Sequence, residues 1–67
     1  MTILELREKR AKAWEAAKGF LDSHRTEKGT LTAEDDATYT RMEKDISDLG
    51  KEIERLERQD ALDAELN

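Results

Sequence analysis

The chain has no cysteine and no proline, and only three glycines, three aromatic residues and one histidine. Without cysteine it can form neither a disulfide framework nor a thiolate metal site. A single histidine, His24, cannot supply a histidine zinc site. No apolar run approaches the roughly 20 residues of a membrane-spanning helix, and the first residues lack the apolar core of a secretory signal. We therefore expect a soluble intracellular protein, or a fragment of one, with no membrane partner, metal or other cofactor.

What the chain does have is charge, since 43% of its 67 residues are Asp, Glu, Lys or Arg and its net charge is −5. Nucleic-acid binding needs a basic face that neutralises phosphates, so this balance argues against a nucleic-acid partner. The short basic cluster Arg7, Lys9, Arg10 and Lys12 is the one feature that favours such binding. High charge can also indicate disorder, but the apolar residues recur with a helical period, which predicts a folded chain.

The first periodic segment predicts a helix over about residues 3–26. Thr2 and Glu5 have the spacing of a capping box, in which each side chain satisfies a free backbone N–H of the other residue. On a helical wheel the apolar residues fall within an arc of about 120°, which is typical of a core-facing stripe. These predicted seam residues are Ile3, Leu6, Ala13, Trp14, Ala17, Phe20 and Leu21.

A turn is predicted over residues 27–31. Gly29 suits the left-handed residue that commonly terminates a helix. Cationic side chains are favourable near the negative end of the helix dipole, and this end carries His24, Arg25 and Lys28.

A second helix is predicted over about residues 32–66. Thr32 is its expected N-cap, and Glu34, Asp35 and Asp36 crowd its first turn, where the helix dipole favours acidic side chains. Its apolar residues have the alternating 3-4 spacing of a coiled coil. They complete the predicted seam with Tyr39, Met42, Ile46, Leu49, Ile53 and Leu56.

These elements predict an all-α fold, an antiparallel two-helix coiled-coil hairpin, because a short linker makes consecutive helices neighbours. Residues 3–26 contain six Lys/Arg against four Asp/Glu, and residues 32–67 contain five against twelve. The net charges of the two segments are therefore +2 and −7, which favours their pairing, although each exposed ion pair contributes only about 0.2–1 kcal/mol. Folding about the turn makes the numbers of facing residues add up to about 58.

Two residues of the first helix need a partner across the seam. Gly19 falls opposite Tyr39, and a mid-helix glycine costs about 1 kcal/mol relative to alanine. We therefore predict that the Tyr39 ring packs over Gly19. Arg10 interrupts the apolar stripe near its centre, with its aliphatic stem covering the seam. Its expected partners are the acidic residues Asp45, Asp48 or Glu52.

The second helix should extend beyond the first, since their lengths are about 52 and 36 Å at 1.5 Å per residue. The first helix then runs out near Leu56, so Asp60 and Asp63 can occupy the next two seam positions without harm. Leu62 and Leu66 point about 140° away from the seam. They are the candidate partner contact, and the alternative is that they belong to a fraying helix end.

No pattern of catalytic residues is present, so we expect no enzyme. The acidic cluster at residues 34–36 is not placed to form a metal site or an acid–base site, because adjacent helix positions point in different directions. The sequence has no motif in which His24 would act with a serine, a cysteine or a paired carboxylate in catalysis. The dispersed glycines form no phosphate-binding loop. One seam offers little stability to so short a chain, which predicts a dimer or a larger helical bundle.

Three stretches carry a family resemblance: "LREKRAKAWEAAK" (residues 6–18), "TAEDDATYTRME" (32–43) and "LGKEIERLERQ" (49–59). With them the chain resembles the start of a tailed-phage major capsid protein of the Hong Kong 97-fold family. The resemblance implies a helical scaffolding region, the delta domain, that precedes the shell domain in a longer chain. It implies as partners other copies of itself and other capsid subunits, and a phage prohead protease as processing enzyme. The implied location is the host cytoplasm, within the assembling prohead.

The alternative function is a free-standing coiled-coil adaptor or regulator that binds another protein. A reading frame that continues past Asn67 for several hundred residues would favour the scaffold, and a stop codon near that residue would favour the adaptor.

Overall fold

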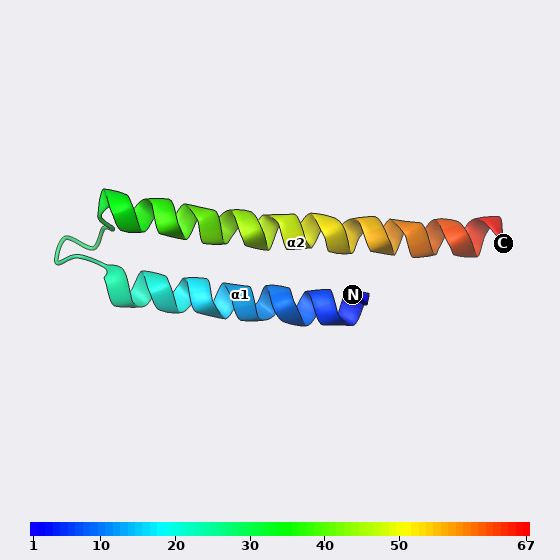
Figure 1. The fold of residues 1–67 in the computed structure, drawn as a ribbon, viewed down its shortest axis with the longest axis horizontal. Helices are drawn as coiled ribbons and strands as arrows, with labels where there is room; N and C mark the ends of the chain where they lie inside the picture. The colour runs from blue at the N-terminus through cyan, green and yellow to red at the C-terminus, as the bar shows by residue number, and fades with distance from the viewer.

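The computed structural model describes residues 1–67 as two helices that lie side by side and run in opposite directions (Figure 1). Helix α1 spans Ile3–His24 and helix α2 spans Ala33–Leu66. The molecule measures 58 × 17 × 16 Å. The predicted all-α, antiparallel two-helix hairpin is confirmed. Neither helix has a stretch that is long and apolar enough to cross a membrane.

The start of α1 is fixed by the predicted capping box. The Glu5 backbone N–H donates to Thr2 Oγ1, and the Thr2 backbone N–H donates to Glu5 Oε1, each over 3.1 Å. The hydrogen bond from the Thr2 backbone N–H, and after it the Thr2 side chain, lowers the pKa of Glu5 from its usual 4.5. The box thus occupies two N–H groups that the first turn of a helix leaves free.

Removing the cap with Thr2→Ala should lower the free energy of unfolding by about 1 kcal/mol. Because the pKa of Glu5 is lower in the folded chain, its carboxylate stabilises the fold above pH 4.5, and this share is lost as the pH falls through the folded pKa. Urea unfolding followed by circular dichroism at pH 7 and pH 3 measures both effects. Thr40→Ala, at an exposed mid-helix threonine, is the control. Equal stability of the two variants at pH 7 would contradict the capping role.

The turn differs in detail from the prediction. Helix α1 ends at His24, because Arg25 has an extended backbone with φ −65° and ψ 135°. Gly29 has the left-handed backbone predicted for it, with φ 80°, but it does not terminate α1. Its N–H instead donates to the carbonyl of Thr26 over 2.9 Å, within a turn that the Thr26 N–H closes by donating to Thr30 O over 2.8 Å.

The two helix ends beside the turn are both capped by side chains. The His24 ring stacks on Phe20, with centroids 4.0 Å apart, and its Nδ1 lies 2.9 Å from the Phe20 carbonyl oxygen. On the other side, Thr32 Oγ1 accepts a hydrogen bond from the Asp35 N–H over 3.2 Å. Glu34, Asp35 and Asp36 fill the first turn of α2, where the dipole favours them.

The core is a single layer between the helices. Only Leu6, Ala17, Gly50 and Ile53 are buried. Trp14 differs from the other predicted seam residues, because 43% of its surface is exposed. The half-buried members of the predicted seam are Ile3, Ala13, Phe20, Leu21, Tyr39, Met42, Ile46, Leu49 and Leu56.

Helix α2 extends well past the start of α1 (Figure 1). Residues 1–4 lie beside Leu56 and Asp60, where they line a shallow depression. Leu62 and Leu66, farther along, are 53% and 77% exposed. The apolar seam therefore stops in the sequence where the neighbouring helix stops in space.

Candidate interaction surface

Arg10 crosses the seam and lies against the backbone of α2. Its Nε–H donates to the carbonyl oxygen of Ile46 over 3.0 Å, and it forms no salt bridge. A methyl group added at Gly50 would lie 2.9 Å from Arg10 Cζ and Nη2. The predicted partners Asp45, Asp48 or Glu52 are therefore wrong, because the missing side chain at Gly50 lets the guanidinium reach a backbone carbonyl.

The predicted packing of Tyr39 over Gly19 is also wrong. Gly19 is exposed, and a methyl group added there would meet nothing within 4 Å. Gly19 follows the buried Ala17 by two positions, or about 200° around the helix, so it points away from α2. The half-buried Tyr39 has its pKa raised, first by desolvation and then by the nearby Glu43 carboxylate.

The two mid-helix glycines should respond differently to alanine. Gly19→Ala should raise the free energy of unfolding by about 1 kcal/mol through helix propensity. Gly50→Ala gains the same propensity but displaces the flexible Arg10 guanidinium from Ile46, so its net effect should be close to zero. Urea titration gives both values. In an Arg10→Ala background Gly50→Ala should regain the full stabilisation, and the same small effect with and without Arg10 would contradict the contact.

One side of the hairpin carries an open groove lined by apolar residues of both helices and by the charged side chains of Arg10 and Glu54. Trp14 and Ala11 line it from α1, and Ile46, Gly50 and Ile53 line it from α2. At its edge the Arg7 guanidinium bridges the helices to Glu57 over 3.0 Å. On the other side of the indole, Lys18 Nζ lies 5.9 Å from the ring centre. We call this side, with Leu4, Ala11 and Trp14 on α1 and Gly50 and Glu54 on α2, the tryptophan face.

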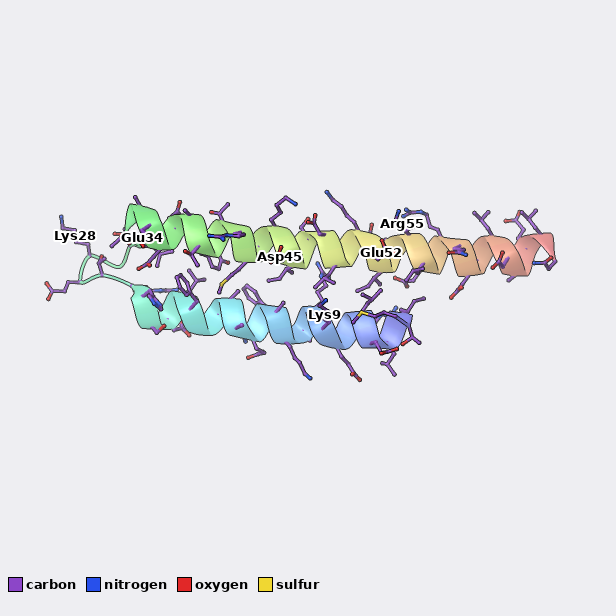
Figure 2. All side chains as sticks on the ribbon, viewed as in Figure 1. Lys9, Lys28, Glu34, Asp45, Glu52 and Arg55 are labelled. Atoms are coloured by element: carbon purple, nitrogen blue, oxygen red, sulfur yellow. The ribbon has the colours of Figure 1, made fainter.

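The opposite side is polar. Lys9 and Ala13 from α1 meet Asp45, Asp48 and Leu49 from α2, and Figure 2 shows Lys9 and Asp45 on the two sides of the gap between the helices. None of the exposed large apolar residues lines this depression. A hydrogen-bonded ion pair along α2 raises the pKa of Lys44 and lowers that of Asp48, with Nζ and Oδ2 2.8 Å apart.

The overhang, residues 61–66, has no neighbour in the hairpin. The predicted contact residues Leu62 and Leu66 are one turn apart on it and largely exposed. About two turns before it, Glu52 and Arg55 form an ion pair within α2 (Figure 2). The hairpin thus has two separate apolar exposures, the tryptophan face and the overhang.

The charged residues form no evident chemical site. No group of three or more His, Cys, Asp or Glu side chains is placed to hold a metal ion. No polar side-chain atom is buried without a hydrogen-bond partner.

Sequence reasoning missed the contact between Arg10 and Gly50, although the signal was present. Gly50 lies four residues after Ile46 and three before Ile53, so helical periodicity places it beside the seam. A glycine at that position leaves room for a long side chain from the facing helix.

The chain matches no protein-family model, no curated protein and no solved structure.

Proposed function

We propose that this chain is a non-enzymatic assembly module that acts by helix-to-helix self-association, and that it serves as the scaffolding domain of a phage capsid protein. The observation that carries the proposed self-association is the solvent-exposed area of the hairpin, which is 5373 Å². A compact monomer of 7.7 kDa would expose about 4,300 Å². The hairpin therefore leaves about 1,000 Å² of surface that a compact domain would have buried.

The distribution of apolar side chains supports association. Met1, Leu4, Trp14, Leu62 and Leu66 are all exposed, while only three apolar side chains are buried. Chains of this size usually need oligomerisation or another reinforcement to be stable. Burial of these side chains between copies would add to the stability of the single hairpin.

Weak association also fits a scaffold, the function that the family resemblance implies. Assembly intermediates must be able to release misplaced subunits, which favours many small and reversible contacts. The balance of −7 over residues 32–67 would repel packaged DNA, and this gives a physical reason for removal by a protease before packaging. Both points support the scaffold role without requiring any catalytic residue.

Sedimentation equilibrium from about 10 μM to 1 mM, a range in which weak helical contacts populate complexes, tests the association. The apparent mass should rise with concentration above the 7.7 kDa of one chain. A monomer at all concentrations would overturn the proposal.

Mass spectrometry of phage particles tests the scaffold role. Peptides from residues 1–67 should be present in proheads and missing from mature virions. Peptides of this segment in mature virions would overturn the removal step. Co-purification with an unrelated protein, and no presence in any particle, would instead identify the chain as an adaptor.

A further inference from the structure

We propose that the tryptophan face binds the tryptophan face of a second copy of this chain, with α1 of each copy packed on α2 of the other. The inference rests on the self-association proposed above and specifies its surface and geometry. The product would be a four-helix bundle in which both turns lie at the same end.

The edges of this face have the spacing of a helix interface. On α1 the 3-4 spacing selects residues that are cationic or apolar: Leu4, Arg7, Ala11, Trp14, Lys18 and Leu21. On α2 the same spacing selects residues that are acidic or small: Glu43, Ser47, Gly50, Glu54, Glu57 and Ala61. In a helical bundle, charged repeats of this spacing flank the apolar seam and set which helices pair.

Charge decides how two such faces meet. If α1 packed on α1, cationic edges would face each other, and if α2 packed on α2, acidic edges would do so. A two-fold axis parallel to the helices instead places α1 of one copy over α2 of the other, in antiparallel orientation. Opposite charges then meet along both contacts, which favours this arrangement.

The register of the contact follows from the hairpin itself. An axis parallel to the helices keeps the axial alignment of α1 and α2, in which Arg7 pairs with Glu57 and Arg10 reaches Ile46. In these two contacts the residue numbers add up to 64 and 56, so facing residues add up to about 60, slightly more than the 58 predicted from the sequence. Lys18 therefore meets Glu43 of the second copy, and Arg7 lies near its Glu54.

The same register places the large side chain of Trp14 against the small Ser47 of the second copy. Ala11 faces the second copy's Gly50, where the Arg10 guanidinium of that copy fills the space beside the glycine. Glu43 and Glu54 form no salt bridge within the hairpin, so neither carboxylate has a cationic partner there, and Glu43 has only the Tyr39 side chain beside it. Tryptophan with small or complementary neighbours is a common centre of binding energy in protein interfaces.

The size of the face indicates a weak interface. The 22 residues of α1 span about 33 Å, and the hairpin is 17 Å wide. Each copy would therefore bury about 560 Å², or about 1,100 Å² for the pair, just below the range of stable complexes. The overhang offers only two leucines, and no exposed large apolar side chain lines the depression on the polar side, so neither surface offers a comparable apolar area.

The single tryptophan of the chain makes the test direct. As the unmodified protein associates, Trp14 emission should shift to shorter wavelength in parallel with the rise in mass. Trp14→Glu should weaken association at least tenfold in sedimentation equilibrium, while circular dichroism retains the helical signal. Leu62→Glu, at an exposed leucine of the overhang, is the control and should associate like the unmodified chain.

A charge exchange tests the pairing of α1 with α2 of the other copy. Lys18→Glu and Glu43→Lys should each weaken association several-fold, and an equimolar mixture of the two variants should restore it. Restoration requires a contact between copies, because neither chain in the mixture has both changes. Lys9→Glu and Asp45→Lys, the matched changes on the polar face, should have little effect alone or mixed.

The outcomes separate the two proposals. If the unmodified chain is monomeric at every concentration, self-association itself is wrong. If it associates without a shift in Trp14 emission, or if Leu62→Glu abolishes association while Trp14→Glu does not, self-association stands and the assigned face is wrong. Failure of the mixed charge variants to restore association overturns the pairing of α1 with α2.

Discussion

Leu6→Ala is expected to lower the free energy of unfolding by about 2–5 kcal/mol, enough to unfold most of a hairpin this small. Leu6 is only 6% exposed and is one of three buried apolar side chains. No second layer covers the seam, so neighbouring side chains cannot compensate for the lost contacts. Thermal and urea unfolding followed by circular dichroism, at a chain concentration where the protein is monomeric, measures the effect.

The same substitution at Leu62 is the matched control. Leu62 lies on the overhang and is 53% exposed, so Leu62→Ala should change stability by less than about 0.5 kcal/mol. Two Leu→Ala variants that differ by several kcal/mol would locate the core in the seam. Equal losses at both positions would mean that α1 does not pack along α2 as described.

Ala17→Leu should destabilise the hairpin by about 1–3 kcal/mol through overpacking. Ala17 is the one residue with no exposed surface, so the helices approach each other closely at this point. Three additional carbon atoms can be accommodated there only if the helices move apart, and movement would loosen the seam on both sides. The midpoint of urea unfolding reports the change.

Ala16→Leu provides the control, because Ala16 precedes this residue in the same helix and is exposed. Leucine and alanine are both good helix formers, so Ala16→Leu should be nearly neutral. If both leucine variants are equally stable, the close approach at Ala17 is absent and the seam is looser than the structure shows.

The hairpin could be predicted because its determinants are local. The Thr2–Glu5 capping box, the 3-4 spacing of apolar residues and the short turn each act within a few residues. Gly29 shows where such reasoning reaches its limit. Its left-handed backbone was predicted, but an extended residue ends α1 earlier, and Gly29 serves the turn instead of the helix end.

Contacts between the helices were harder to predict. Gly19 and Gly50 are both mid-helix glycines, but Gly19 points away from the facing helix, whereas Gly50 lies beside the seam, where the long Arg10 side chain reaches it. Arg10 was expected to meet a carboxylate, since charge pairing is visible in sequence whereas access to a backbone carbonyl is not. Such access depends on which neighbour lacks a side chain.

The placement of Trp14 follows from the shape of the fold. An apolar arc of about 120° suits a helix that is covered by several neighbours, but α1 has a single neighbour. A pair of helices buries only the middle of that arc, and a ring as large as indole cannot enter the narrow space between them. Trp14 therefore lies at the edge, where it becomes part of a candidate interface.

Small-angle X-ray scattering over a concentration series tests most directly the claim that this hairpin shares its apolar face with a second copy. When dilute, the chain should scatter as a hairpin with a long axis near 58 Å. As concentration rises, the mass should double while the longest dimension stays almost unchanged, because the copies stack side by side with both turns at one end. A mass that stays at 7.7 kDa, or a particle that lengthens as it gains mass, would contradict this account.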